Sequence, residues 1–126
     1  MSVENKILAT AEVISKTVQT LIGNVINVGY HSHISLFIKY TKGDETGLTV
    51  QAHVQRTAAA DIAQTQGWST AAGVKTATLN SYTMTTAVQH VITLDVRGIE
   101  FIKFTQGGSS NDGTPTGVYS ASYTLE

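Results

Sequence analysis

The strictest constraint on this chain is a period-two alternation of apolar and polar residues in several of its segments. The alternation is clearest in His33–Tyr40, Leu48–Gln55 and His90–Val96, where the polar positions are mainly Thr, Ser and Gln. Successive side chains of a strand point to opposite faces of its sheet, so this pattern is typical of strands with one face in a core and one face outside. We therefore expect strands whose outer faces carry few charges.

The length and the spacing of these segments predict the fold class. The chain has 126 residues, which is the size of one compact domain. Strand-like runs separated by turn residues recur about eight times along it, and short strands at such spacing indicate an antiparallel β-sandwich or a jelly-roll-like barrel. We expect a single all-β domain over residues 1–126, with a strand order that the pattern does not reveal.

Two pairs of alternating segments are predicted to form β-hairpins. The first pair flanks the Gly-containing turn Thr41–Gly47, and the second pair flanks Gly98, which separates His90–Arg97 from Ile99–Thr105. Gly at a turn permits the backbone angles that other residues avoid. The stretch Lys6–Ile22 is rich in β-branched residues and is expected to be extended. Its first part, within Met1–Lys16, is interpreted as a possible arm that adds a strand to the sheet of a neighbouring molecule.

Composition argues against several classes of function. The chain has no Cys, which excludes disulfides and thiolate chemistry. Its 8 basic and 9 acidic residues are spread along the sequence, which disfavours binding to nucleic acid through phosphate contacts. No apolar run approaches the length of a membrane span, and no signal peptide is visible. Only 13% of the residues are charged, and such a surface offers little protection against association, so we expect an oligomer or a component of a larger assembly.

Residues that could carry chemistry are present, but their spacing favours other roles. His31 and His33 could lie on one side of a strand and contribute to a metal site, although no third ligand is set by spacing. Asp95 and Glu100 flank a turn and could form a carboxylate pair, but Asp95 is better interpreted as the partner of a nearby base. His90 is in phase with apolar residues and is expected to be partly buried. We predict no catalytic residues, no metal site and no cofactor, and the protein is not expected to be an enzyme.

Apolar and aromatic side chains are the candidates for contacts with partners. A lone Trp in a loop either folds back onto the core or contacts a partner, and Trp is common at binding hot spots. Tyrosines with a wet hydroxyl can line such a surface or form a platform for a sugar. The interface candidates are Trp68, Ile7, Leu8, Tyr30, Tyr119 and Tyr123.

Two stretches carry a resemblance to a known group of proteins. The segment Ser35–Thr46, which reads SLFIKYTKGDET, resembles a strand and turn of small virion-associated proteins of tailed phages. The segment Thr93–Ile102 is similar to their late hairpin, which a Gly-rich loop and a terminal strand follow. The resemblance implies a β-sandwich component of the virion, such as a capsid decoration (cement) protein, made in the host cytoplasm. It also implies trimers or other small oligomers that bind capsid subunits, and it offers no catalytic residues.

Two functional hypotheses remain after these observations. The first is a non-enzymatic structural protein of a phage particle that acts through contacts with virion subunits and with its own copies. The alternative is a carbohydrate- or receptor-binding β-sandwich module of a tail or fibre, which would use Trp68, Tyr82 and the other exposed tyrosines. The role of Arg56–Gly73 is left open by the sequence.

Overall fold

All of the regular secondary structure in the described part of the chain is β-strand. The computed structural model describes residues 5–16, 19–55, 77–108 and 114–126, and Trp68 with the rest of Arg56–Gly73 lies outside these ranges. The strands are β1 (Lys6–Val13), β2 (Thr20–Leu21), β3 (Ile26–Asn27), β4 (His33–Thr41), β5 (Leu48–Gln55), β6 (Ala77–Met84), β7 (Val88–Asp95), β8 (Phe101–Gly107) and β9 (Val118–Leu125). The predicted all-β class is confirmed, with nine strands where about eight were expected.

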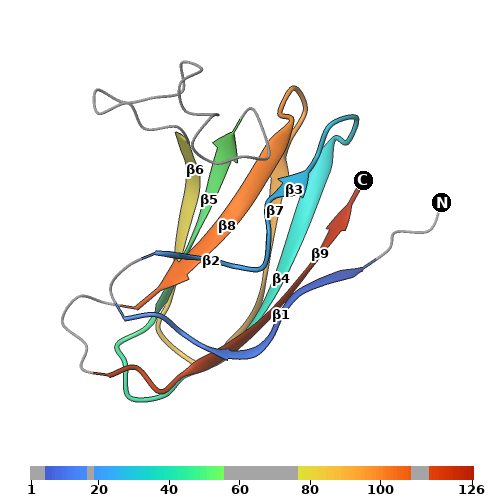
Figure 1. The fold of residues 1–126 in the computed structure, drawn as a ribbon. Helices are drawn as coiled ribbons and strands as arrows, with labels where there is room; N and C mark the ends of the chain where they lie inside the picture. The colour runs from blue at the N-terminus through green and yellow to red at the C-terminus, as the bar shows by residue number, and fades with distance from the viewer. Residues whose placement is uncertain (1–4, 17–18, 56–76, 109–113) are drawn as a thin grey trace.

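The strands form two antiparallel sheets that face each other (Figure 1). Sheet A has the order β1-β9-β4-β7, and sheet B has the order β2-β8-β5-β6, with β3 also paired to β8. Most connections cross from one sheet to the other, and this arrangement of interleaved strands is the connectivity of a jelly roll. The sandwich prediction is therefore confirmed, and the strand order that the sequence left open is now defined.

Both predicted hairpins are wrong. Strand β4 pairs with β7 and β9, whereas β5 pairs with β6 and β8, so the turn between β4 and β5 passes from sheet A to sheet B. The turn between β7 and β8 crosses between the sheets in the same way. Alternation states which face of a strand is buried, but both strands of a crossover bury one face in the same core. The pattern therefore cannot distinguish a hairpin from a crossover.

The core lies between the sheets and consists of the apolar members of the alternating segments. In β4 every second residue from Ile34 to Tyr40 is buried, and in β7 Ile92 and Leu94 are buried with the same period. His90 is half-buried in phase with them, as expected, and its ring lies 5.9 Å from the ring of Tyr82 on β6. The period-two pattern is thus the direct cause of the two-layer packing.

The N-terminal stretch differs from the expected arm. Residues 6–13 form β1, which pairs with β9 of the same chain rather than reaching toward a neighbour. Leu8, Ala9 and Ile14 are buried in the core, which explains why this stretch stays on its own sheet. The pairing is interrupted by register shifts on both sides of Ala9, and Ala11 has a positive φ of 45°.

Within the described residues, no helix has the length and apolarity that a membrane span requires.

Candidate functional site: the outer face of sheet A

An apolar row crosses the outer face of sheet A. The register pairs Ile7 with Ser122, Ser122 with Phe37, and Phe37 with Val91, so these four residues lie side by side on four neighbouring strands. Ile7 is 74% exposed, Phe37 is 38% exposed and Val91 is 52% exposed. We call these four residues the apolar row. Large apolar side chains that gather on an exposed face indicate a surface for contact.

A shallow groove accompanies the apolar row. Its volume is about 570 Å³, and strands β1, β9, β4 and β7 all contribute to it. The next row of the sheet places Lys39 between Gln89 and Ser120, and all three residues line the groove. The groove therefore combines apolar side chains with hydroxyl, amide and ammonium groups, and the ammonium group comes from Lys39.

The outer face of sheet B has a different character, because its polar groups bond to one another. His53 on β5 lies 3.0 Å from the hydroxyl of Thr105 on β8 through its Nε2 atom. The same hydroxyl is hydrogen-bonded to the side-chain amide of Gln19 at 2.8 Å. Burial lowers the pKa of His53, and the positive charge of the neighbouring Lys103 lowers it further. This network holds strands together and leaves fewer groups for a partner.

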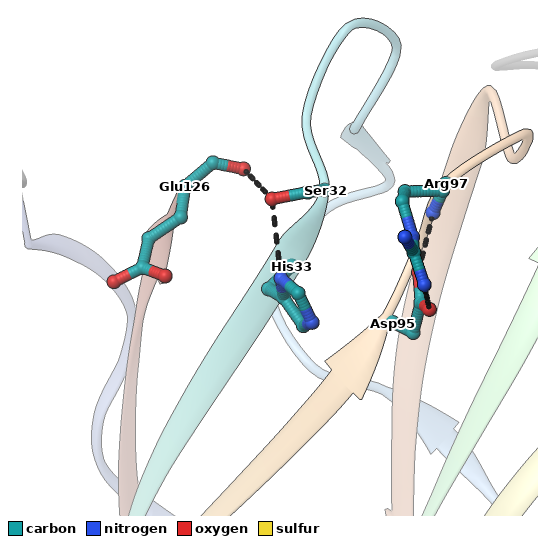
Figure 2. A network of polar contacts seen from close by, with 5 residues as sticks. All are labelled: Ser32, His33, Asp95, Arg97 and Glu126. Atoms are coloured by element: carbon teal, nitrogen blue, oxygen red, sulfur yellow. Dashed lines mark hydrogen bonds and ion pairs between the residues drawn. The ribbon is translucent and has the colours of Figure 1, made fainter.

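One end of the sandwich carries a cluster of polar contacts (Figure 2). The hydroxyl of Ser32 donates to the backbone oxygen of Glu126 at 3.2 Å and lies 3.1 Å from Nδ1 of His33. Beside them, the guanidinium of Arg97 binds both carboxylate oxygens of Asp95, with Nε at 3.0 and 3.1 Å. Hydrogen bonds from the Arg97 side chain and backbone lower the pKa of Asp95. The expected pairing of Asp95 with a nearby base is confirmed.

This cluster does not have the geometry of a catalytic triad. The hydroxyl of Ser32 donates its hydrogen bond to the backbone oxygen of Glu126. In a triad the carboxylate would accept a hydrogen bond from a histidine, whereas the Asp95 carboxylate accepts hydrogen bonds from Arg97. The described residues also contain no group of three or more His, Cys, Asp or Glu side chains that could hold a metal ion. The cluster instead anchors the C-terminal residue, because Glu126 exchanges backbone hydrogen bonds with His33 at 3.0 and 3.2 Å.

The opposite end of the sandwich is built around a buried carboxylate. Glu45, in the turn between β4 and β5, is 1% exposed. Its Oε2 accepts hydrogen bonds from the hydroxyl of Tyr40 and, at 2.7 Å, from the backbone N–H of Gly43. Its Oε1 accepts from the N–H groups of Thr116 and Gly117 at 3.1 and 2.7 Å. We call Glu45 and these donors the Glu45 hub, and it ties the β4–β5 turn to the segment that enters β9.

The surroundings of Glu45 favour its charged form. Burial raises the pKa of a carboxyl group, but the hydrogen bonds from Tyr40, Gly43 and Gly117 outweigh burial and lower the pKa of Glu45 to about 2. The fit is tight, since a Cβ atom added to Gly117 would lie 2.2 Å from Oε2 of Glu45. The sequence predicted a turn here from its glycines and polar residues, but it did not predict that Glu45 would be buried at the centre of the turn.

The predicted interface residues divide into three groups. Ile7 and Tyr30 are exposed, and Tyr30 stands in a turn with a positive φ of 68°. Leu8, Tyr119 and Tyr123 are buried in the core, so they are not available on the surface of one chain. Their places are a correction to the sequence interpretation, because the apolar partners on β1 and β9 face inward with the same period as the rest of the core. Trp68 lies outside the described residues.

Phe37 and Val91 were missed as surface candidates, although the sequence contains a signal for both. Each stands at a position that the alternation assigns to the outer face, among residues such as Ser35, Lys39 and Thr93. An apolar residue in phase with the polar side of an alternating strand is an exception to the pattern. That exception, rather than the pattern itself, marks the apolar row.

Comparisons with known proteins identify the fold and no family. No protein-family model and no curated protein matches the chain. Among solved structures, PirA is similar with a TM-score of 0.57 and 9% identity, over 94% of each chain. The capsid protein of the Triatoma virus empty capsid is similar with a TM-score of 0.55 and 7% identity, over 98% of this chain and 87% of its own. The SPBc2 prophage-derived protein YomS has a TM-score of 0.50 and 11% identity, over 100% of this chain and 96% of its own.

These similarities show that the same sandwich occurs in a viral capsid protein and in a prophage-derived protein. Identities this low establish the architecture alone, and one architecture serves many functions. The function of this chain therefore has to be argued from its own surfaces.

Proposed function

We propose that this protein is a non-enzymatic structural component of a phage particle, of the capsid decoration (cement) type. It would attach to virion subunits and to copies of itself through the outer face of sheet A. The observation that carries the proposal is the apolar row, which is exposed on a face with few charges. The exposed apolar side chains of this face are in contact with water, which is unfavourable. A partner that covers the face would remove apolar surface from solvent and so stabilise the complex.

The mechanism would be repetition of a modest contact. The apolar row and its groove cover only part of one small domain, so a single contact would be weak. On a symmetric shell the same contact recurs in every copy, and contacts between neighbouring copies add to the total affinity. The likeness of the fold to a capsid protein and to a prophage-derived protein supports this setting. Trimers remain an expectation of the sequence resemblance.

The direct test is the composition of purified particles. Particles of the phage whose genome encodes the chain should be purified by density gradient and analysed by quantitative mass spectrometry. The proposal predicts a constant number of copies per particle that high salt does not remove, because an apolar contact is not weakened by screening. Recovery of the protein only in the soluble lysate would overturn it.

The groove favours a second candidate, a carbohydrate-binding module. Its volume of about 570 Å³ is in the range of small-molecule sites. Phe37 offers a flat apolar surface, and Lys39 and Gln89 offer polar groups beside it. A glycan array read with the wild-type protein and with Phe37→Ser tests this function. Saturable binding that Phe37→Ser removes would favour it over the structural role.

A further inference from the structure

The four edges of the two sheets are not equally protected against pairing with another strand. An open edge presents unpaired N–H and C=O groups, and natural proteins protect edges with bulges, charges, proline or very short strands. In sheet A the edges are β1 and β7, and in sheet B they are β2 with β3 on one side and β6 on the other. Strand β7 lies along one side of sheet A, next to β4 (Figure 1).

Three of these edges carry a protective feature. The register of β1 shifts twice, and Ala11 on it has a positive φ. Strands β2 and β3 have two residues each. The pairing of β6 contains a shift opposite Ala52 and His53. By contrast, β7 pairs with β4 without interruption over eight residues, from Val88 to Asp95. Val88–Leu94 contains no proline and no Asp, Glu, Lys or Arg.

The hydrogen-bond pattern shows which groups of β7 face the open edge. His33 exchanges backbone hydrogen bonds with Glu126, next to β9, so His33 directs its backbone groups away from β7. The direction in which backbone groups point alternates from one residue to the next along a strand. The 2.9 Å hydrogen bond from the N–H of Val96 to the backbone oxygen of Ser32 is consistent with this alternation. The backbone groups of Gln89, Val91 and Thr93 therefore point to the open side, where the described residues supply no strand.

We propose that β7 pairs with β7 of a second copy of this chain, antiparallel and centred on Val91. In this register Val91 faces Val91 of the second copy, and Gln89 faces Thr93, so the outward backbone groups of these three residues find partners. The apolar rows of the two copies meet at the shared edge. They then form one continuous band across sheet A of one copy and sheet A of the other. A two-fold contact of this kind closes at two copies. The pairing concerns the isolated protein and does not depend on attachment to a particle.

Cysteine cross-linking tests the register directly, because the natural chain has no Cys. Opposed residues of such a pair have Cα atoms about 5.5 Å apart, which a disulfide can span. We expect Val91→Cys to form a disulfide-linked dimer on mild oxidation. Val13→Cys is the matched control, since Val13 is 61% exposed on β1 and Val91 is 52% exposed on β7. Cross-linking of Val91→Cys no faster than of Val13→Cys would overturn the proposal.

Sedimentation velocity gives a second readout that needs no oxidation. The wild-type protein should dimerise with increasing concentration, and Val91→Lys should shift the distribution to monomer by at least tenfold in the dissociation constant. Val13→Lys should leave the distribution unchanged, and equal melting temperatures would show that both variants fold. A wild-type monomer at all concentrations, or a trimer that Val91→Lys leaves intact, would contradict pairing through β7.

Discussion

The outer face of sheet A and the Glu45 hub differ in the groups that they expose and bury: the face exposes apolar side chains, and the hub buries a charged one. The apolar row leaves Ile7, Phe37 and Val91 in contact with solvent, whereas the hub buries a carboxylate and satisfies it with four donors. A buried charge with all its hydrogen bonds holds a fold in one arrangement, and an exposed apolar row contributes little until something covers it. The difference indicates that the hub serves stability and the face serves contact.

The largest effect is expected at the centre of the hub. Glu45→Ala leaves the N–H groups of Gly43, Thr116 and Gly117 without their acceptor in a buried site. Hydrogen bonds to charged groups are among the stronger ones in proteins, so the free energy of unfolding should fall by about 4 kcal/mol. Urea denaturation measures this loss. If Glu45→Ala lowered the free energy of unfolding by less than about 1 kcal/mol, the hub would contribute no more to stability than the outer face of sheet A.

Acid should weaken the hub without any substitution. The pKa of Glu45 is lowered from 4.5 to about 2 on folding, so its contribution is complete above pH 4.5 and is lost as the pH falls toward 2. The shift corresponds to about 3 kcal/mol at neutral pH. Denaturation midpoints between pH 2 and pH 7 measure it. Glu45→Gln should flatten this curve, while Asp95→Asn, which removes an exposed carboxylate, should leave most of the slope in place.

A smaller loss is expected where the backbone approaches Glu45. Gly117→Ala would place a Cβ atom 2.2 Å from Oε2 of the carboxylate, and the displacement should cost about 2 kcal/mol. Gly29→Ala is the matched control, because its nearest contact would be a side-chain atom of Asn27 at 3.2 Å. Thermal unfolding of both variants provides the comparison. Equal melting temperatures would show that the segment before β9 moves freely away from the hub.

The smallest effect on stability is expected on the outer face of sheet A. Phe37→Lys should change the free energy of unfolding by less than about 1 kcal/mol, because Phe37 is already 38% exposed. The same substitution should weaken association at the apolar row at least tenfold. A loss as large as that of Glu45→Ala would mean that Phe37 belongs to the core, and the contrast between the two regions would fail.

The parts of this structure that the sequence predicted follow from single strands. The period of two identified the buried faces of β4, β5 and β7, because burial of one face depends only on residues within the strand. The pairing of strands depends on residues far apart, and for that reason the turns before β5 and β8 were mistaken for hairpin turns. The Glu45 hub was missed for the same reason, since its donors at Thr116 and Gly117 lie 71 and 72 positions away.

The site residues show the same limit. Tyr119 and Tyr123 were proposed for the surface, and they alternate with Ser120 and Ser122 in a way that burial of the tyrosines explains. Their position in β9, between β1 and β4 in sheet A, could not be inferred without the strand order. Ile7 is exposed and stays a candidate for contact, but its neighbours in the apolar row could be identified only from the register.

If the outer face of sheet A attaches the protein to virion subunits, substitutions on that face should weaken its binding to particles. Particles from a phage that lacks the gene should be titrated with labelled wild-type protein, with Phe37→Lys, and with Gln51→Lys as a control on sheet B. We predict saturable binding of the wild type and of Gln51→Lys, and at least tenfold weaker binding of Phe37→Lys. Absence of saturable binding by the wild type, or equal binding of Phe37→Lys, would contradict attachment through the outer face of sheet A.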